Sequence, residues 1–330
     1  MARSVEQLVD GFGRVHRDLR ISVTDRCNFR CDYCMPEEGV EWLPRSELLS
    51  FEEIERVARL LVERFGITSI RLTGGEPTLR ARLPLLVGAL AALRVDLSLT
   101  TNGSSLARMA DDLAAAGLGR VNVSLDSLRA DRFVQLTRRD ALDEVLAGID
   151  AALAAGLQPV KLNVVPVRGV NDDEIAAFVR FGASRGVEVR FIEFMPLDAQ
   201  AEWRRDRVVA RADLLAAVAA EFDFKPLERD HEPAERYQLA DGVGVFGIVP
   251  SVTAPFCAAC DRLRLTSDGM LRNCLFSADE VDLRTLLREG ATDDEIADAA
   301  RRCVADKRAG HGIGEPTFVQ PPRPMSQIGG

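Results

Sequence analysis

The sequence lacks the features of a secreted, membrane-spanning or nucleic-acid-binding protein. Residues 1–13 include acidic residues and no apolar core, so we expect no secretory signal. The runs of Ala and Leu are interrupted by Arg, Asp or Gly before they are long enough to span a bilayer. The formal net charge of −9 argues against a broad basic face for nucleic acid, although a local basic cluster can still bind a compact anion. We expect no membrane and no nucleic-acid partner.

The cysteines also lack the pattern of a disulfide framework. Their number, seven, is odd, and six of them fall in two clusters. In a reducing compartment, clustered cysteines more often bind metal or take part in chemistry. We therefore expect the protein to be cytoplasmic.

The first cluster contains Cys27, Cys31 and Cys34 in the spacing C-x3-C-x2-C. A structural zinc site takes four ligands, and no histidine or fourth cysteine lies nearby. Soft thiolates at this spacing favour an iron–sulfur cluster, and three thiolates would leave one iron of a four-iron cluster free to bind a ligand. Two alternatives stay open, namely ordinary thiols and a zinc site with a distant fourth ligand.

From residue 18 to residue 195 the sequence alternates short aliphatic runs with amphipathic stretches. We expect strands at 19–23, 69–72, 97–100, 121–125, 160–165 and 187–191, with helices between them. Ser50 and Glu53 form a capping box for a helix that Gly66 ends, and Asn171 is expected to cap a helix over 172–185. Six βα units in series predict an α/β fold with a parallel sheet or an open, partial TIM-like barrel.

The pattern changes after residue 195. We expect a helix over 210–222, a hairpin formed by 237–239 and 243–249, a turn at 267–269 and a helix near 293–307. The stretch from residue 310 is rich in Gly and Pro and is expected to be extended. A boundary near 196–210 divides the chain into a barrel, 1–200, and a C-terminal region, 201–330.

The second cysteine cluster lies in this C-terminal region. Cys257, Cys260 and Cys274 again offer three thiolates, and none of the three histidines of the chain falls within the motif. A zinc ion with a fourth ligand elsewhere and a second iron–sulfur cluster are equally compatible with the spacing. Cys303 lies in a predicted helix among Ala and Val, so we interpret it as a core thiol.

Polar residues are expected where the strands end. Thr73-Gly-Gly-Glu-Pro77 follows the second strand, and its glycines allow close approach of the backbone to a ligand, although such a sequence is also a common tight turn. Other strands end at Thr100–Gly103, Ser124–Asp126, Lys161–Asn163 and Glu193–Met195. Carboxyl ends of parallel strands share one mouth in a barrel, so these groups are expected to lie together with the first cysteine loop.

Several arginines fall within strands. Arg71 and Arg190 either point inward, where they require a partner, or lie outward in solvent. Arg262 and Arg264 alternate and so share one face, which suits a grip on phosphate oxygens or an ordinary salt bridge. The final residues, Gly329 and Gly330, predict either a disordered end or a slim strand that enters a pocket.

Taken together, these motifs resemble the radical S-adenosylmethionine (SAM) superfamily and, within it, the GTP 3′,8-cyclase (MoaA) family of molybdenum cofactor biosynthesis. The resemblance extends from Arg17 through the C-x2-C-x13-C motif to the terminal Gly-Gly. It implies a partial (βα)6 barrel whose C-terminal α+β extension carries a second iron–sulfur cluster. Ser69, at a position where relatives carry a basic residue, the short loop over 37–49 and the Pro-rich tail depart from the family pattern.

The resemblance also implies roles for individual residues. Two [4Fe-4S] clusters would be held by Cys27, Cys31 and Cys34, and by Cys257, Cys260 and Cys274. Contacts with SAM are implied for Tyr33, Gly75, Ser124 and Met195. Contacts with GTP are implied for Arg20, Arg71, Thr100, Lys161, Arg190, Arg262 and Arg264, and the tail Gly329-Gly330 would enter the active site.

The reaction that the family implies is a lyase reaction. A 5′-deoxyadenosyl radical from SAM takes hydrogen from C3′ of GTP, and C3′ then bonds to C8 to give 3′,8-cyclo-7,8-dihydro-GTP. The implied partners are GTP, a low-potential electron donor such as flavodoxin or ferredoxin, and the next enzyme, cyclic pyranopterin monophosphate synthase; a homodimer is left open. The alternatives are a radical SAM enzyme that modifies a peptide or cofactor, and a non-catalytic iron–sulfur electron carrier.

Overall fold

A single curved sheet forms the frame of the molecule. The computed structural model describes residues 5–197, 203–228, 232–316 and 318–329. Within these ranges twelve strands are hydrogen-bonded in the order β12-β11-β10-β1-β2-β3-β4-β5-β6-β9-β8-β7. The first six are β1 Asp18–Ser22, β2 Ser69–Thr73, β3 Asp96–Thr101, β4 Arg120–Ser124, β5 Val160–Val164 and β6 Glu188–Ile192. The others are β7 Phe224–Pro226, β8 Glu235–Leu239, β9 Val245–Val249, β10 Arg262–Leu265, β11 Met270–Arg272 and β12 Val281–Asp282.

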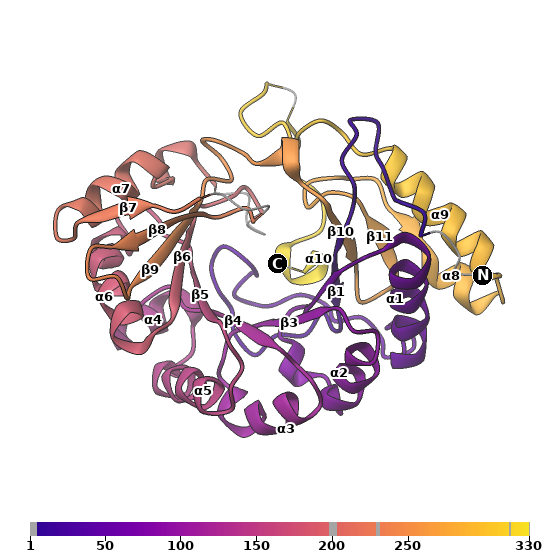
Figure 1. Cartoon of the computed structure of the whole chain (residues 1–330), viewed down its shortest axis with the longest axis horizontal. Helices are drawn as coiled ribbons and strands as arrows, with labels where there is room; N and C mark the ends of the chain where they lie inside the picture. The colour runs from indigo at the N-terminus through magenta and orange to yellow at the C-terminus, as the bar shows by residue number, and fades with distance from the viewer. Residues whose placement is uncertain (1–4, 198–202, 229–231, 317, 330) are drawn as a thin grey trace.

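Helices cover the outer face of this sheet, as Figure 1 shows. Those of the six βα units are α1 Phe51–Phe65, α2 Leu83–Ala91, α3 Ala110–Ala115, α4 Ala130–Thr137, α5 Leu142–Ala154 and α6 Ile175–Arg185. The C-terminal region adds α7 Arg211–Ala219, α8 Leu283–Arg288, α9 Asp293–Ala305 and α10 Met325–Ile328. Short 3-10 turns lie at Pro77–Leu79, Leu106–Arg108, Asp172–Glu174, Arg205–Arg207 and Cys257–Ala259.

Strands β1 to β6 are parallel, and their residues alternate between two environments. In β1, for example, Leu19 and Ile21 are completely buried in the hydrophobic core, whereas Arg20 between them lines the interior cavity described below. Arg71 in β2 and Arg190 in β6 line the same cavity. The partial barrel predicted from the six βα units is confirmed. Of the two positions left open for Arg71 and Arg190, inward or outward, the structure shows the inward one.

The helix-end predictions have different outcomes. The Ser50 hydroxyl accepts from the Glu53 amide at 3.1 Å, the Glu53 carboxylate accepts from the Ser50 amide at 2.7 Å, and Gly66 ends α1 with φ of 72°, so that prediction is confirmed. The predicted cap at Asn171 is wrong. Its amide nitrogen donates to the Asp126 carbonyl and its oxygen accepts from the Val167 amide, both at 2.7 Å. Its side chain thus bonds to the loops after β4 and β5 and makes no cap hydrogen bond, and the chain passes through the 3-10 turn Asp172–Glu174 before α6 begins at Ile175.

The C-terminal region extends the sheet at both ends of the barrel. Strand β9 is parallel to β6, and β10 is parallel to β1. The predicted hairpin is the antiparallel pair β8–β9, and the turn predicted at 267–269 joins the antiparallel strands β10 and β11. The helices expected over 210–222 and near 293–307 are α7 and α9. The sheet is therefore continuous across the boundary expected near 196–210, and the division there stays a prediction.

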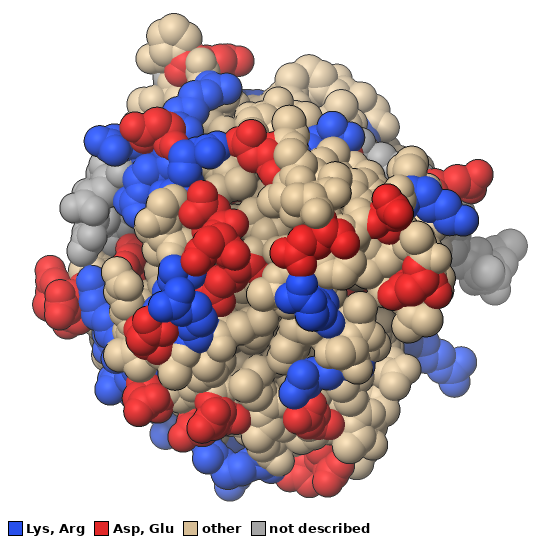
Figure 2. Space-filling view, turned by 90° about the vertical axis from the view of Figure 1, so that its left-hand side faces the viewer, with Lys and Arg blue, Asp and Glu red and all other residues tan. Residues whose placement is uncertain are grey.

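The outer surface carries both signs of charge. On the face shown in Figure 2, acidic and basic side chains are interspersed rather than segregated. Exposed pairs such as Arg180–Glu221 and Arg185–Asp150 join neighbouring elements of the helical layer. Among the described helices, none has the length and apolar character needed to cross a membrane.

Candidate active site

A cavity of about 240 Å³ lies inside the barrel, where strand ends from its two halves converge. Strands β1 to β4 contribute Arg20, Arg71, Thr100 and Ser124, in that order. The C-terminal region closes the opposite wall with Cys257, Cys260, Arg262, Arg264 and Cys274. The cavity therefore brings together most of the residues that the sequence singled out, from segments far apart in the chain.

Three arginines stand side by side in this cavity. Arg20 is the register partner of Arg264 on one side and of Arg71 on the other. Burial lowers the pKa of Arg20, and repulsion by the neighbouring arginines is the second cause of this shift. Burial also lowers the pKa of Arg71 and of Arg264 to about 10. Arg20 Nε has no hydrogen-bond partner within the described part of the chain. Buried guanidiniums in this arrangement suit a polyanionic ligand.

The wall beside the first cysteine loop contains a buried acid, Asp126, which the sequence placed among the polar strand ends without giving it a role. The Tyr33 hydroxyl donates to Asp126 at 2.5 Å, and the other Asp126 oxygen accepts from the Val165 amide at 2.7 Å. Burial raises the pKa of Asp126 to about 6, although both hydrogen bonds oppose the shift. Ser124 and Met195 line the cavity beside this pair. This wall offers hydroxyl, carboxylate and thioether groups.

The first cysteine loop lies next to that wall. Cys34 and Met35 donate backbone hydrogen bonds to the Cys31 carbonyl at 2.9 and 3.0 Å, which folds the motif into a turn. Burial raises the pKa of Cys27 to about 11 and that of Cys34 to about 12. Thiols buried to this extent become thiolates when a bound cation compensates the charge, so the three residues fit an iron–sulfur cluster.

The GGEP motif, residues 74–77, packs against the backbone that leads into this loop. A Cβ atom at Gly75 would lie 2.4 Å from the Arg26 carbonyl oxygen and 2.5 Å from that of Asp25, so only glycine fits. The Glu76 carboxylate is buried and accepts from the Thr78 and Asn102 amides at 3.0 and 2.6 Å. The structure thus gives Gly75 a packing role. Gly75 does not line the 240 Å³ cavity, and its contact with SAM stays a prediction.

A Gly75→Ala substitution is expected to destabilise the protein by about 3 kcal/mol or more, because the new methyl overlaps backbone rather than a movable side chain. Iron bound by the first cysteine loop is expected to be lost with it. Chemical denaturation and iron analysis measure both effects. Gly11→Ala is the matched control, since a Cβ atom there meets nothing within 4 Å. Normal stability of Gly75→Ala would contradict the packing role.

The second cysteine set faces the cavity directly. Cys257 begins a short 3-10 turn that Cys260 follows directly, and Cys274 lies just after β11. Burial raises the pKa of Cys260 but is outweighed by Lys307 and Arg262, which lower it overall. Among the described residues no three Cys, His, Asp or Glu side chains are gathered tightly enough for one metal ion. Three thiols facing one cavity are the donor set that a four-iron cluster takes, while the spacing alone leaves the zinc alternative open.

Cys303 is separate from this set. It is 4% exposed, belongs to the hydrophobic core, and lies 3.6 Å from the Leu271 carbonyl oxygen. The prediction that it is a core thiol is confirmed.

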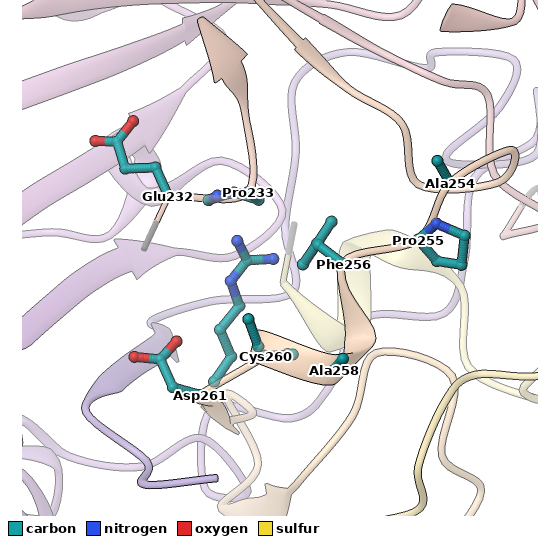
Figure 3. A pocket seen from close by; sticks show the side chains of 10 residues that line it. Glu232, Pro233, Ala254, Pro255, Phe256, Ala258, Cys260 and Asp261 are labelled. Atoms are coloured by element: carbon teal, nitrogen blue, oxygen red, sulfur yellow. The ribbon is translucent and has the colours of Figure 1, made fainter. Parts of the chain in front are cut away.

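Lys161 is placed differently from the other predicted substrate contacts. It does not line the 240 Å³ cavity, and its ammonium lies 3.1 Å from Glu232. Arg190 contacts the same Glu232 carboxylate and also Glu188, at 2.6 Å. Glu232 borders a neighbouring hollow of about 450 Å³, where Figure 3 shows it next to Pro233 and apart from Cys260 and Asp261, which also line the hollow. No feature of the sequence indicated that Glu232 would neutralise both cations.

The tail enters the barrel. Figure 1 shows α10 near the centre of the ring of strands. Met325 lines the cavity, and the Gly329 carbonyl oxygen accepts a hydrogen bond from Arg264. A Cβ atom at Gly329 would lie 2.2 Å from the Ser22 hydroxyl oxygen, so the residue is tightly enclosed. Insertion is therefore observed as far as Gly329, while Gly330 lies outside the described residues. Asn163, which the sequence placed at a strand end, also lines the cavity, and so do Phe276 and His311, which were not predicted.

Comparison with known protein families agrees with this arrangement. Residues 21–182 match the Radical SAM superfamily, and residues 187–313 match Molybdenum Cofactor Synthesis C. Among solved structures, Streptococcus suis SuiB superposes with a TM-score of 0.60 at 14% identity, covering 91% of this chain and 69% of that one. The same protein bound to S-adenosylmethionine gives a TM-score of 0.57 at 14% identity, covering 79% and 61%. The fold and the site define a radical SAM enzyme, a class that uses SAM and a [4Fe-4S] cluster.

The particular family follows from closer relatives. The chain is 52% identical to GTP 3′,8-cyclase of Mycolicibacterium smegmatis, over 98% of this chain and 92% of that one. It is 51% identical to the enzyme of the same name from Streptomyces coelicolor, over 98% and 96%. The chain belongs to the GTP 3′,8-cyclase family.

Proposed function

We propose that the protein converts GTP to 3′,8-cyclo-7,8-dihydro-GTP, an early step of molybdenum cofactor biosynthesis. The observation that carries this proposal is one cavity with three distinct walls: Tyr33 of the first cysteine loop, the row of buried arginines, and the second set of cysteines. A nucleoside triphosphate matches two of these walls. Its phosphates suit the guanidiniums of the arginine row, and its base can bind an open iron of a cluster held by the second set of cysteines.

Cys27, Cys31 and Cys34 would hold the cluster that binds SAM, with Tyr33, Gly75, Ser124 and Met195 around the SAM molecule. When bound there, SAM and the cluster supply a carbon-centred radical able to take a hydrogen atom from the ribose. The protein provides the rest of the catalysis by positioning. It must hold C3′ against SAM and keep water out of a cavity that the tail helps to close.

GTP would lie across the cavity with its base toward Cys257, Cys260 and Cys274. Its phosphates would meet the cationic set Arg20, Arg71, Lys161, Arg190, Arg262 and Arg264, with Thr100 beside them. The unpartnered Nε of Arg20 supports this placement, since a buried donor without an acceptor is costly until an anion supplies one. For Lys161 and Arg190, binding of phosphate requires displacement of Glu232.

The reaction needs two electrons and one proton. With SAM bound, one electron would be used in releasing methionine from it, and hydrogen taken from GTP would leave 5′-deoxyadenosine as the other product. After the C3′–C8 bond forms, the second electron and a proton complete the dihydropurine. A low-potential donor such as flavodoxin or ferredoxin would supply the electrons, in the cytoplasm, and cyclic pyranopterin monophosphate synthase would accept the product.

We include in the proposal a barrel over 1–200 and an auxiliary-cluster region over 201–330.

An anaerobic assay tests the proposal. The reconstituted protein, given dithionite, SAM and GTP, is expected to yield 5′-deoxyadenosine and a cyclised nucleotide in equal amounts, detected by mass spectrometry. 5′-Deoxyadenosine without consumption of GTP would favour the enzyme that modifies a peptide or cofactor. No 5′-deoxyadenosine from protein with both clusters loaded would exclude radical chemistry and leave the electron carrier.

A further inference from the structure

Lys307 is a buried cation outside the substrate cavity. It lies just beyond α9, is 5% exposed, and is one of only three lysines in the chain. Its ammonium does not line the 240 Å³ cavity or the neighbouring hollow. None of the roles assigned above to SAM or GTP uses it. A buried charge of this kind is costly unless its surroundings compensate it, so its neighbours indicate what it does.

Those neighbours surround the second cysteine motif. Lys307 Nζ donates to the carbonyl oxygens of Cys260, at 3.0 Å, and Arg262, at 3.1 Å. It lies 2.9 Å from His16 Nε2, which must accept because an ammonium has only donors. The fourth neighbour is the Cys260 sulfur, at 3.7 Å. Three N–H groups thus serve four acceptors, and one of the four is a predicted cluster ligand.

The same end of the motif is fixed from a second direction. Arg14 donates to the Cys257 carbonyl oxygen at 2.7 Å and to the Arg308 carbonyl oxygen at 2.7 Å. Its Nε contacts Asp10 at 2.5 Å. The segment around Arg14 and the residues after α9 therefore bracket the turn that carries Cys257 and Cys260. Of these two cations, Lys307 is the one whose ammonium lies beside a cysteine sulfur, that of Cys260.

We propose that Lys307 is a positioning residue that sets the reduction potential of the second cluster. This inference rests on the proposed function only in assuming that Cys257, Cys260 and Cys274 hold a cluster. A positive charge beside a thiolate ligand stabilises the reduced cluster, which carries one more negative charge. Lys307 would thereby keep the second cluster reducible while it holds the guanine base, although it touches neither GTP nor SAM.

The sign of the effect distinguishes this role from simple packing. Removing a fixed positive charge makes the reduced state less favourable and lowers the midpoint potential. Loosening the turn so that water reaches the cluster does the opposite, because a more polar environment stabilises the more highly charged reduced state. A structural role and an electrostatic role for Lys307 therefore predict shifts in opposite directions.

The test compares Lys307→Met, Lys307→Arg and Lys225→Met in the reconstituted full-length protein. Lys225 is an exposed lysine in β7, at the far end of the sheet from β10, and so controls for loss of a lysine. Redox titrations followed by electron paramagnetic resonance measure each cluster, with the first cluster as internal reference. Lys307→Met is expected to weaken reduction of the second cluster at least tenfold, which for one electron is about 59 mV to lower potential. Lys307→Arg and Lys225→Met are expected to change it less than threefold.

An unchanged or higher potential in Lys307→Met would overturn the proposal. If that variant does not retain its second cluster, Lys307→Gln, which keeps donors without charge, decides in the same way. Wild-type protein that binds only one cluster would instead show that the assignment of the second cysteine set is wrong, a separate failure visible before any variant is made.

Discussion

The Cys274→Ser variant is expected to lose about half of its iron and to lose GTP turnover by at least about 10²-fold, because the base would no longer be held against the reacting ribose. Binding of SAM is expected to persist, since the first cysteine loop is a separate turn that does not include Cys274. Iron analysis, SAM binding and product formation under anaerobic conditions measure the three quantities.

Cys303→Ser is the matched control for that experiment. Cys303 contributes the seventh thiol, but its side chain lies in the core beside the Leu271 carbonyl. We expect this variant to keep its full iron content and to lose only about 1–3 kcal/mol of stability, from burial of a hydroxyl group. Unchanged turnover in Cys274→Ser, or loss of iron in Cys303→Ser, would show that the second cluster is not ligated as proposed.

The second large effect is expected at Arg20. Replacement by Met removes one of three adjacent guanidiniums, and a charge-assisted hydrogen bond contributes about 1.5–3 kcal/mol, so GTP affinity should fall about ten- to a hundredfold. The ligand-free protein should be as stable as the parent or more stable, because an apolar side chain replaces a buried charge that faces other cations. GTP binding and thermal unfolding in the absence of GTP measure the two effects.

Arg59→Met provides the comparison for Arg20→Met. Arg59 is an exposed arginine of α1 that pairs with Glu55 and Glu63 one turn away. Its loss is expected to leave GTP affinity unchanged and to have little effect on stability, because exposed ion pairs contribute little. Full GTP affinity in Arg20→Met would remove the arginine row from the substrate site, and strong destabilisation of the ligand-free variant would show that Arg20 has a structural role instead.

Sequence periodicity was sufficient for the barrel because its information is local. Each strand of the barrel alternates residues that meet the helices with residues that face the interior, and this alternation is visible within five residues, as in Leu19, Arg20 and Ile21. The capping box at Ser50 is equally local. Periodicity left Arg71 and Arg190 open between inward and outward positions, and the place of Arg20 was implied only by the family resemblance.

Contacts between distant segments could not be predicted in this way. The Asn171 side chain had two uses available, a helix cap and a loop contact, and only the position of Asp126 decides between them. Glu232 neutralises Lys161 from a loop far along the chain, and no short-range pattern specifies that meeting. The contacts of Lys307 were unpredictable for the same reason, because they join Lys307 to His16, which is 291 residues earlier in the chain.

The parallel pairing of β1 with β10 has a consequence for how the protein is made. On the ribosome, β1 emerges early, but the strand that covers one of its edges, beginning at Arg262, emerges only after the whole barrel has been synthesised. Until then that edge presents free peptide groups, which are a template for wrong pairing with other chains. Because Cys257 and Cys260 directly precede β10, we expect the second cysteine set to be fixed in place only after the strands of the barrel have been synthesised. Loading of the cluster proposed for that set is then expected to follow synthesis of the barrel.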